Sequence, residues 1–122
     1  MHRDSPQLSA MKAEMIKALA HPLRLSITEF LSGGERCVCD IAGRVGAGRS
    51  NVSRHLALMV RAGVLSNRKE GLMVLYRLRC PCVMRFLQCV DGMLRERIGS
   101  AEALLRKRRP RPVRRRGRGR MM

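Results

Sequence analysis

The sequence is poor in aromatic residues. Trp is absent, and two Phe and one Tyr are the only aromatic side chains among 122 residues. A chain of this length forms about one domain, so we expect a single modest core built from aliphatic side chains and Met. The scarcity of aromatic rings also argues against a protein that binds single-stranded nucleic acid by stacking bases.

Long hydrophobic runs are missing as well. No apolar run exceeds five residues, which excludes a transmembrane span or the apolar region of a signal peptide. We therefore expect a protein of the reducing cytoplasm, in which the five cysteines are thiols rather than a disulfide framework. No nucleophile–base pair, phosphate loop or paired carboxylate stands out, so neither an enzyme nor an organic cofactor is predicted.

Acidic residues are few, and the charge balance is strongly basic. There are 26 Lys and Arg against 9 Asp and Glu, a formal net charge of +17. Ten of the basic residues lie between positions 106 and 120, so a formal charge of +7 remains for the rest of the chain. A basic body with a basic tail attracts polyanions by electrostatic steering and counterion release, and nucleic acid is the usual partner.

The spacing of apolar residues predicts four helices in the first half of the chain. The first ends near residue 21, because the residue before Pro22 is disfavoured in the helical region, and the second follows directly from Pro22. A short third helix has its buried stripe at Val38, Ile41, Ala42 and Val45, and a glycine-containing turn separates it from a fourth helix over about 49–62. Two helices joined in this way are the signature of a helix-turn-helix.

After the fourth helix, the spacing of apolar residues changes from the period of a helix to the period of a strand. Residues 64–69 and 72–78 read as a hairpin with its turn at Glu70-Gly71, and a hairpin behind a helix-turn-helix is a wing. A heptad-like helix over about 81–106 follows. The predicted fold is therefore mainly α with a small β-hairpin (α+β): a winged helix-turn-helix of order ααααββα over residues 9–105. We expect disordered ends at 1–8 and 106–122, and a homodimer formed through the first and last helices.

Four motifs in the same order resemble the ArsR/SmtB family of metal-responsive repressors. They are Ala20-His21-Pro22-Leu23-Arg24-Leu25, Cys37-Val38-Cys39-Asp40-Ile41, Val52-Ser53-Arg54-His55-Leu56-Ala57-Leu58, and Arg68-Lys69-Glu70-Gly71 with Tyr76-Arg77-Leu78. The resemblance covers roughly residues 11–95 and is closest to the arsenic-responsive type. It implies a homodimeric bacterial repressor that occupies its double-stranded operator without metal, where it is associated with the nucleoid, and leaves the operator when metal binds.

The second helix of a helix-turn-helix enters the major groove, with its N-terminal residues at the base edges. Arginine pairs bidentately with guanine, and serine serves a base edge or a phosphate. His55 matches the family motif, either as a phosphate contact or as a helix-packing residue. At the wing tip we expect phosphate or minor-groove contacts without base specificity. The predicted DNA-binding residues are Arg49, Ser50, Asn51, Ser53, Arg54, His55, Arg68 and Lys69.

Cys37 and Cys39 match the family's arsenic-sensing motif of two thiolates one residue apart, and thiolates select soft ions. The resemblance implies As(III) or Sb(III) as inducer, with Cd, Zn or Pb as further possibilities. The third cysteine of that motif is replaced here by Ala42. Positions i and i+2 differ by about 200° around a regular helix, so binding should unwind the first turn of the third helix. The alternative interpretation is two ordinary small residues at a helix start.

Cys80, Cys82 and Cys89 form an alternative metal site at the start of the last helix. Some relatives hold arsenic with three cysteines near this helix, which makes a three-thiolate site here the second hypothesis. The alternative interpretation of Cys89 is a buried core thiol. Two further hypotheses for the whole chain remain open at this point: a thiol-redox-sensing repressor of the same fold, and a basic architectural nucleic-acid-binding protein without an inducer.

Overall fold

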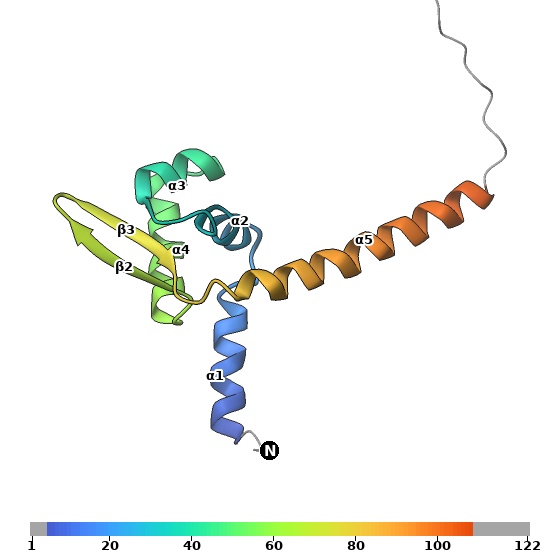
Figure 1. Ribbon diagram of the computed structural model, residues 1–122, viewed down its shortest axis with the longest axis horizontal. Coiled ribbons are helices and arrows are strands. Elements are labelled where there is room, and N and C mark those ends of the chain that lie inside the picture. Colours follow the sequence, from blue (N-terminus) through green and yellow to red (C-terminus); the bar gives the residue numbers. More distant parts are fainter. Residues whose placement is uncertain (1–4, 109–122) are drawn as a thin grey trace, which may run out of the picture. The chain divides into compact units, whose positions relative to one another are not determined.

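The computed structural model describes residues 5–108, and the chain divides into two compact units between Met84 and Arg85. Figure 1 shows the succession of helices and strands, with the β2–β3 hairpin projecting from the helical part of the first unit. The elements are α1 (Pro6–Lys17), α2 (Pro22–Leu31), β1 (Arg36–Cys37), α3 (Val38–Val45), α4 (Arg49–Arg61), β2 (Leu65–Glu70), β3 (Met73–Leu78) and α5 (Val83–Arg108).

Local signals set the ends of the first helices. The Ser5 hydroxyl accepts a hydrogen bond from the Leu8 amide, and Pro6 opens α1 where a missing N–H has no effect. His21 has an extended backbone, and its Nδ1 accepts from the Leu23 amide at 3.0 Å, which caps α2. Gly46, at φ 71°, ends α3 in the left-handed conformation that glycine adopts without strain.

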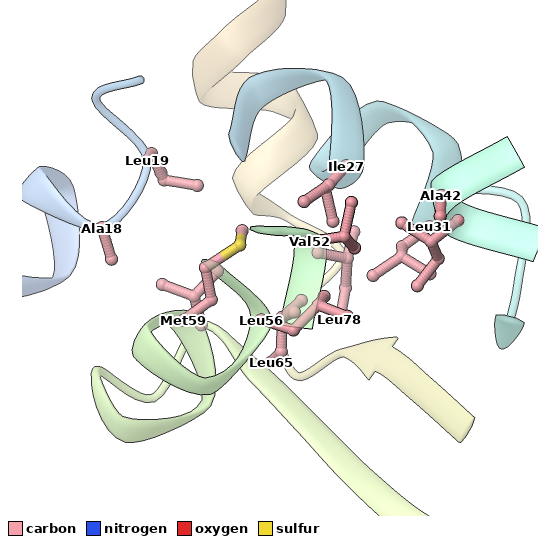
Figure 2. Close-up of a cluster of buried hydrophobic side chains, with 12 residues drawn as sticks. Ala18, Leu19, Ile27, Leu31, Ala42, Val52, Leu56, Met59, Leu65 and Leu78 are labelled. Atoms are coloured by element: carbon pink, nitrogen blue, oxygen red, sulfur yellow. The ribbon is translucent and has the colours of Figure 1, made fainter. Parts of the chain in front are cut away.

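The core of the first unit joins the three central helices to the sheet. Apolar side chains from α2, α3, α4, β2 and β3 meet there, and Figure 2 shows Ile27, Val52, Leu56 and Leu78 pointing toward one another. The largest completely buried side chains are Ile27, Thr28, Ile41, Val52, Leu56, Met59 and Leu65. Because α3 and α4 share this core, they are held as a rigid helix-turn-helix.

A three-stranded antiparallel sheet of order β1-β3-β2 supports the wing. β2 and β3 pair along their whole length, from Leu65 opposite Leu78 to Glu70 opposite Met73. Gly71, at φ 64°, allows the tight turn, and Leu72 at the tip is fully exposed. The short β1 pairs with the other edge of β3, with Arg36 opposite Tyr76 and Cys37 opposite Leu75.

The predicted winged helix-turn-helix is confirmed, with four differences of detail. The strand β1 was not predicted, so the order is ααβααββα. Residues 6–8, assigned to a disordered N-terminus, belong to α1, because Ser5 caps a helix there. Residues 106–108, assigned to the disordered tail, continue α5. The expectation of five free thiols was wrong for the pair Cys80 and Cys82, which form a disulfide.

The remainder of both predicted disordered ends, residues 1–4 and 109–122, lies outside the described residues. Over residues 5–108, no helix is both long and apolar enough to cross a membrane.

Candidate DNA-binding surface and thiol sites

The polar face of α4 is the centre of the candidate DNA-binding surface. Val52, Leu56 and Met59 anchor the opposite face of this helix in the core. Gly48 precedes the helix and gives no side-chain cap, so the first amides of α4 remain available to a phosphate. The predicted DNA-reading residues on this face are all exposed, namely Arg49, Ser50, Asn51, Ser53 and Arg54.

Within this face, Arg54 Nη2 donates a hydrogen bond to Asn51 Oδ1 at 3.3 Å. The bond joins residues one turn apart and lies at the surface, where it orients the guanidinium without burying it. A guanidinium held in this way keeps donors free for a guanine edge or a phosphate. The assignment of these residues to DNA contact stays a prediction.

At the wing, Arg68 is engaged by two carboxylates of its own chain. Its Nε and Nη2 each donate to a Glu35 carboxylate oxygen at 2.9 Å, and Nη2 lies 3.1 Å from Glu70 Oε1. The hydrogen bond from Arg68 lowers the pKa of Glu35, and the same pair raises the pKa of Arg68. Any phosphate contact by Arg68 must therefore compete with these carboxylates, whereas the neighbouring Lys69 is simply exposed.

His55 is half-buried on α4 and bridges the recognition helix to α2. Arg24 Nη1 lies 3.0 Å from His55 Nδ1, and the His21 ring is tilted against the His55 ring with centroids 4.6 Å apart. Arginine is always a donor, so Nδ1 must accept and the imidazole is neutral in this arrangement. Arg24 also donates through Nε to the Ala18 carbonyl at 2.8 Å. These contacts agree with the helix-packing interpretation of His55.

The neutral state of His55 predicts acid sensitivity. Burial lowers its pKa below the ordinary 6.5, and the charges of His21, Arg24 and Arg54 lower it further. The unfolded chain therefore binds more protons than the folded one, and stability present above pH 6.5 is lost as the pH falls toward the folded-state pKa. We expect the free energy of unfolding in urea to decrease from pH 7.5 to pH 5.5.

His55→Gln supplies the control, because glutamine keeps an oxygen acceptor for Arg24 but does not titrate in this range. Carboxylates contribute equally in both proteins, so only the difference between the two pH profiles reports on His55. Parallel profiles for wild type and variant would show that His55 does not titrate differently in the folded chain.

Cys37 and Cys39 lie at the junction of β1 and α3. Cys37 is half-buried, has an extended backbone (φ −86°, ψ 166°) and precedes the helix, whereas Cys39 is exposed in the first turn. Both cysteines were expected in the first turn of the third helix, and this expectation was wrong for Cys37, which lies in β1. Because Cys37 is paired with β3, a ligand shared by the two sulfurs pulls on the junction between strand and helix rather than on a helical turn alone.

The alternative set lies around the start of α5. Cys80 and Cys82, which flank Pro81, are joined by a disulfide with their Cα atoms 5.3 Å apart, within the range such bonds require. Cys89 is a free and exposed thiol on α5, which differs from the core-thiol interpretation. Among residues 5–108, no group of three His, Cys, Asp or Glu side chains is placed to hold a metal ion.

Sequence reasoning missed two residues that shape this surface. Arg24 was noted only as part of a motif, and its contact with His55 spans 31 positions. Glu35 gave no signal, because its partner Arg68 is 33 positions away on the wing. Long-range pairs of this kind leave no periodic trace in one sequence.

A helix-turn-helix with an exposed polar recognition helix, followed by an antiparallel hairpin, defines a winged-helix DNA-binding domain. A family model described as "Bacterial regulatory protein, arsR family" matches residues 21–67. The uncharacterized HTH-type transcriptional regulator Rv0081 of Mycobacterium tuberculosis is 33% identical over 103 residues, which cover 84% of this chain and 90% of that protein. The chain belongs to the ArsR family of helix-turn-helix transcriptional regulators, and its relatives are regulators rather than enzymes.

Three further comparisons show similarity to members of this kind. The arsenical resistance operon repressor of Escherichia coli is 44% identical over 66 residues, which are 53% of this chain and 56% of that repressor. A homodimeric winged helix-turn-helix domain of Mycobacterium bovis, described as a possible ArsR-family regulator, superposes with a TM-score of 0.67 at 31% identity. That match covers 80% of this chain and 94% of the other. The crystal structure of Rv0081 gives a TM-score of 0.69 at 32% identity, covering 80% of this chain and 98% of that one.

Proposed function

We propose that this protein is a transcriptional repressor that binds its operator as a homodimer and is released when As(III) or Sb(III) binds Cys37 and Cys39. One observation carries the proposal: the two thiols lie on either side of the first residue of α3, the helix that packs against the recognition helix. The likeness to the arsenical resistance repressor of E. coli supports the choice of inducer.

Operator binding rests on the polar face of α4 and on the wing. Arg49, Ser50, Asn51, Ser53 and Arg54 enter the major groove, His55 braces the helix from behind, and Lys69 with Arg68 reaches the flanking backbone. The formal charge of +17 strengthens association with any duplex through counterion release, so it adds affinity without sequence information.

Dimerisation is supported by apolar faces that the described chain does not cover. α1 contains no buried residue and exposes Leu8, Met11, Met15 and Ile16. The α5 residues of the second unit expose Phe86, Met93, Leu94, Ile98, Leu104 and Leu105. Helices with such faces are stabilised when a partner covers them. The M. bovis relative, which is described as homodimeric, supports a homodimer. In our proposal the interface is formed by the first and last helices.

Induction follows from the position of the two thiols. Ile41 and Ala42 of α3 are buried in the same core as Val52 and Leu56 of α4. A soft ion that draws the sulfurs of Cys37 and Cys39 together changes the path of the chain at the start of α3 and therefore the support of α4. Couplings of this kind amount to about 1–3 kcal/mol, so arsenite should weaken operator binding by about 5- to 150-fold.

An anisotropy titration of a labelled operator duplex tests the proposal. The wild type should release the duplex when arsenite is added. The double variant Cys37→Ser with Cys39→Ser should bind the duplex as tightly as the wild type does without arsenite, and it should remain bound when arsenite is added. Cys89→Ser is the matched control, because it removes another free thiol and should respond like the wild type. If arsenite released the duplex from the double variant as readily as from the wild type, the metal site would instead be assigned to Cys80, Cys82 and Cys89.

The disulfide between Cys80 and Cys82 favours a second candidate function, thiol-redox sensing by the same repressor. Oxidation converts the two thiols to one disulfide and passes two electrons and two protons to an oxidant such as diamide, which becomes the hydrazine. The segment concerned connects β3 of the wing to α5. In this case diamide should release the operator from the wild type but not from Cys80→Ser, and arsenite should release it from neither. That result would establish redox sensing in place of arsenic sensing.

A further inference from the structure

A cavity of about 490 Å³ lies against α2 and the end of α3, and none of the predicted DNA-reading residues or cysteines lines it. Its volume is in the range of pockets that hold small organic ligands. It is lined by residues from α2, from the loop that follows, from β1 and from α3, among them Ser26, Glu29, Phe30, Gly33, Arg36 and Arg44.

Two guanidinium groups are gathered at one aromatic ring of this cavity. The Cζ atom of Arg36 lies 4.9 Å from the centroid of the Phe30 ring, and the Cζ atom of Arg44 lies 5.4 Å from it. The ring attracts each cation through its quadrupole, yet it does not neutralise either charge. Within residues 5–108, neither guanidinium forms an ion pair with a carboxylate.

Arg36 also has a hydrogen-bond donor that is not satisfied. Its Nε is buried and has no hydrogen-bond partner, the single buried side-chain nitrogen or oxygen of residues 5–108 in that condition. A buried donor without a partner is costly, and most such donors are satisfied in native proteins. A rotation of the side chain would bring its Nε–Nη2 edge to a bound oxyanion, in the bidentate geometry that arginine offers to carboxylates and phosphates.

Glu29, which also lines the cavity, restricts which ligands can bind there. A carboxylate among the lining residues repels the continuous negative charge of a nucleic-acid backbone. A small ligand with one anionic group and one hydroxyl avoids this conflict, because the hydroxyl donates to Glu29 while the anionic group faces the guanidiniums.

We propose that this cavity is a binding site for a small organic anion, held through its carboxylate or phosphate group by Arg36 and Arg44 and through a hydroxyl by Glu29. The site joins α2, β1 and α3, so its ligand stabilises the packing of the helix that precedes the recognition helix. No cysteine is among the lining residues, so the proposed ligand does not need the thiols.

Nuclear magnetic resonance of the ¹⁵N-labelled full-length protein tests the site, with citrate and glycerol 3-phosphate as probes. Glycerol and sodium chloride, at matched concentration and ionic strength, control for the neutral skeleton and for salt. Saturable shifts confined to the backbone amides of residues 29–36 and 44–45 and to the Arg36 Nε–H signal are expected with a probe. Shifts spread over all basic segments, without saturation, would overturn the proposal.

Variants separate the cavity from the general basic charge. Arg36→Gln with Arg44→Gln should weaken probe binding by about tenfold to a hundredfold, the scale of lost hydrogen bonds to charged groups. Arg97→Gln with Arg106→Gln removes the same charge from exposed positions of α5 and should leave probe binding unchanged. Equal weakening in both double variants would overturn the proposal.

Two further measurements keep the test decisive. If the glutamine pair does not fold, Arg36→Lys with Arg44→Lys keeps the charge and the apolar stems, and it should still weaken binding because the Nε donors are lost. Operator affinity without probe should be equal in the two glutamine double variants, because each has lost two positive charges. A larger loss of operator affinity and of salt dependence in the Arg36 and Arg44 pair would assign these arginines to DNA phosphates and overturn the proposal.

Discussion

Arg54→Ala is expected to weaken operator binding by about 1–3 kcal/mol, or roughly five- to 150-fold, and Arg49→Ala by a similar factor. Both guanidiniums lie on the exposed face of α4, and Arg54 is oriented by Asn51, with no carboxylate of residues 5–108 paired to it. A lost guanine contact should reduce specificity as well as affinity. Fluorescence anisotropy with an operator duplex obtained by selection from a random pool, at about 150 mM salt, measures the effect.

Arg68→Ala and Arg97→Ala are the comparisons for this experiment. Arg68 already shares its charge with Glu35 and Glu70, so its loss should cost less than the loss of Arg54. Arg97 lies on α5, and its removal should change only the general attraction to DNA. If Arg54→Ala bound the selected duplex as tightly as Arg97→Ala, the polar face of α4 would not be the reading surface.

Leu56→Ala is expected to destabilise the fold by about 2–5 kcal/mol. Leu56 is 0% exposed and lies on the buried face of α4, in the core shared with α2 and the sheet (Figure 2). Domains are stable by only about 5–15 kcal/mol, so this one truncation removes a large part of the total. For a domain of this size the midpoint of thermal unfolding should fall by about 10–30 °C.

Leu72→Ala is the matched control, because it makes the same chemical change at the wing tip, where the side chain is 102% exposed. Its midpoint of unfolding should stay close to that of the wild type. Both proteins are compared at one concentration, since the stability of a dimer depends on it. A similar small change in both variants would mean that the α4 side chain is not in the core.

The sequence predicted most of the fold because its main elements have strong local signals. Apolar periodicity located the helices, Pro22 and Gly46 set helix ends, and Gly71 set the turn of the wing. The two-residue strand β1 is too short for any alternation pattern, so it could be found only by its pairing with β3. This pairing corrected the view of Cys37, which is not helical.

The candidate site could be predicted as a set of residues but not as a set of contacts. The exposed face of α4 follows from helical spacing, and the structure places all five predicted side chains of its first turns on that face. The pairing of Arg68 with Glu35, the bracing of His55 by Arg24 and the gathering of Arg36 and Arg44 at Phe30 join residues from different elements. Such contacts depend on tertiary packing, which a single sequence does not display.

The pairing of β1 with β3 has a mechanical consequence for signalling. Leu75 of β3 lies between Cys37 of β1 on one side and Arg68 of β2 on the other, so one row of paired residues joins Cys37 to the hairpin that carries Arg68 and Lys69. We therefore expect a displacement of Cys37 to shift the start of α3 and the wing together. If a ligand at Cys37 is the inducer, as proposed, the recognition helix and the wing should lose the operator together, without an intermediate in which only one of them remains bound.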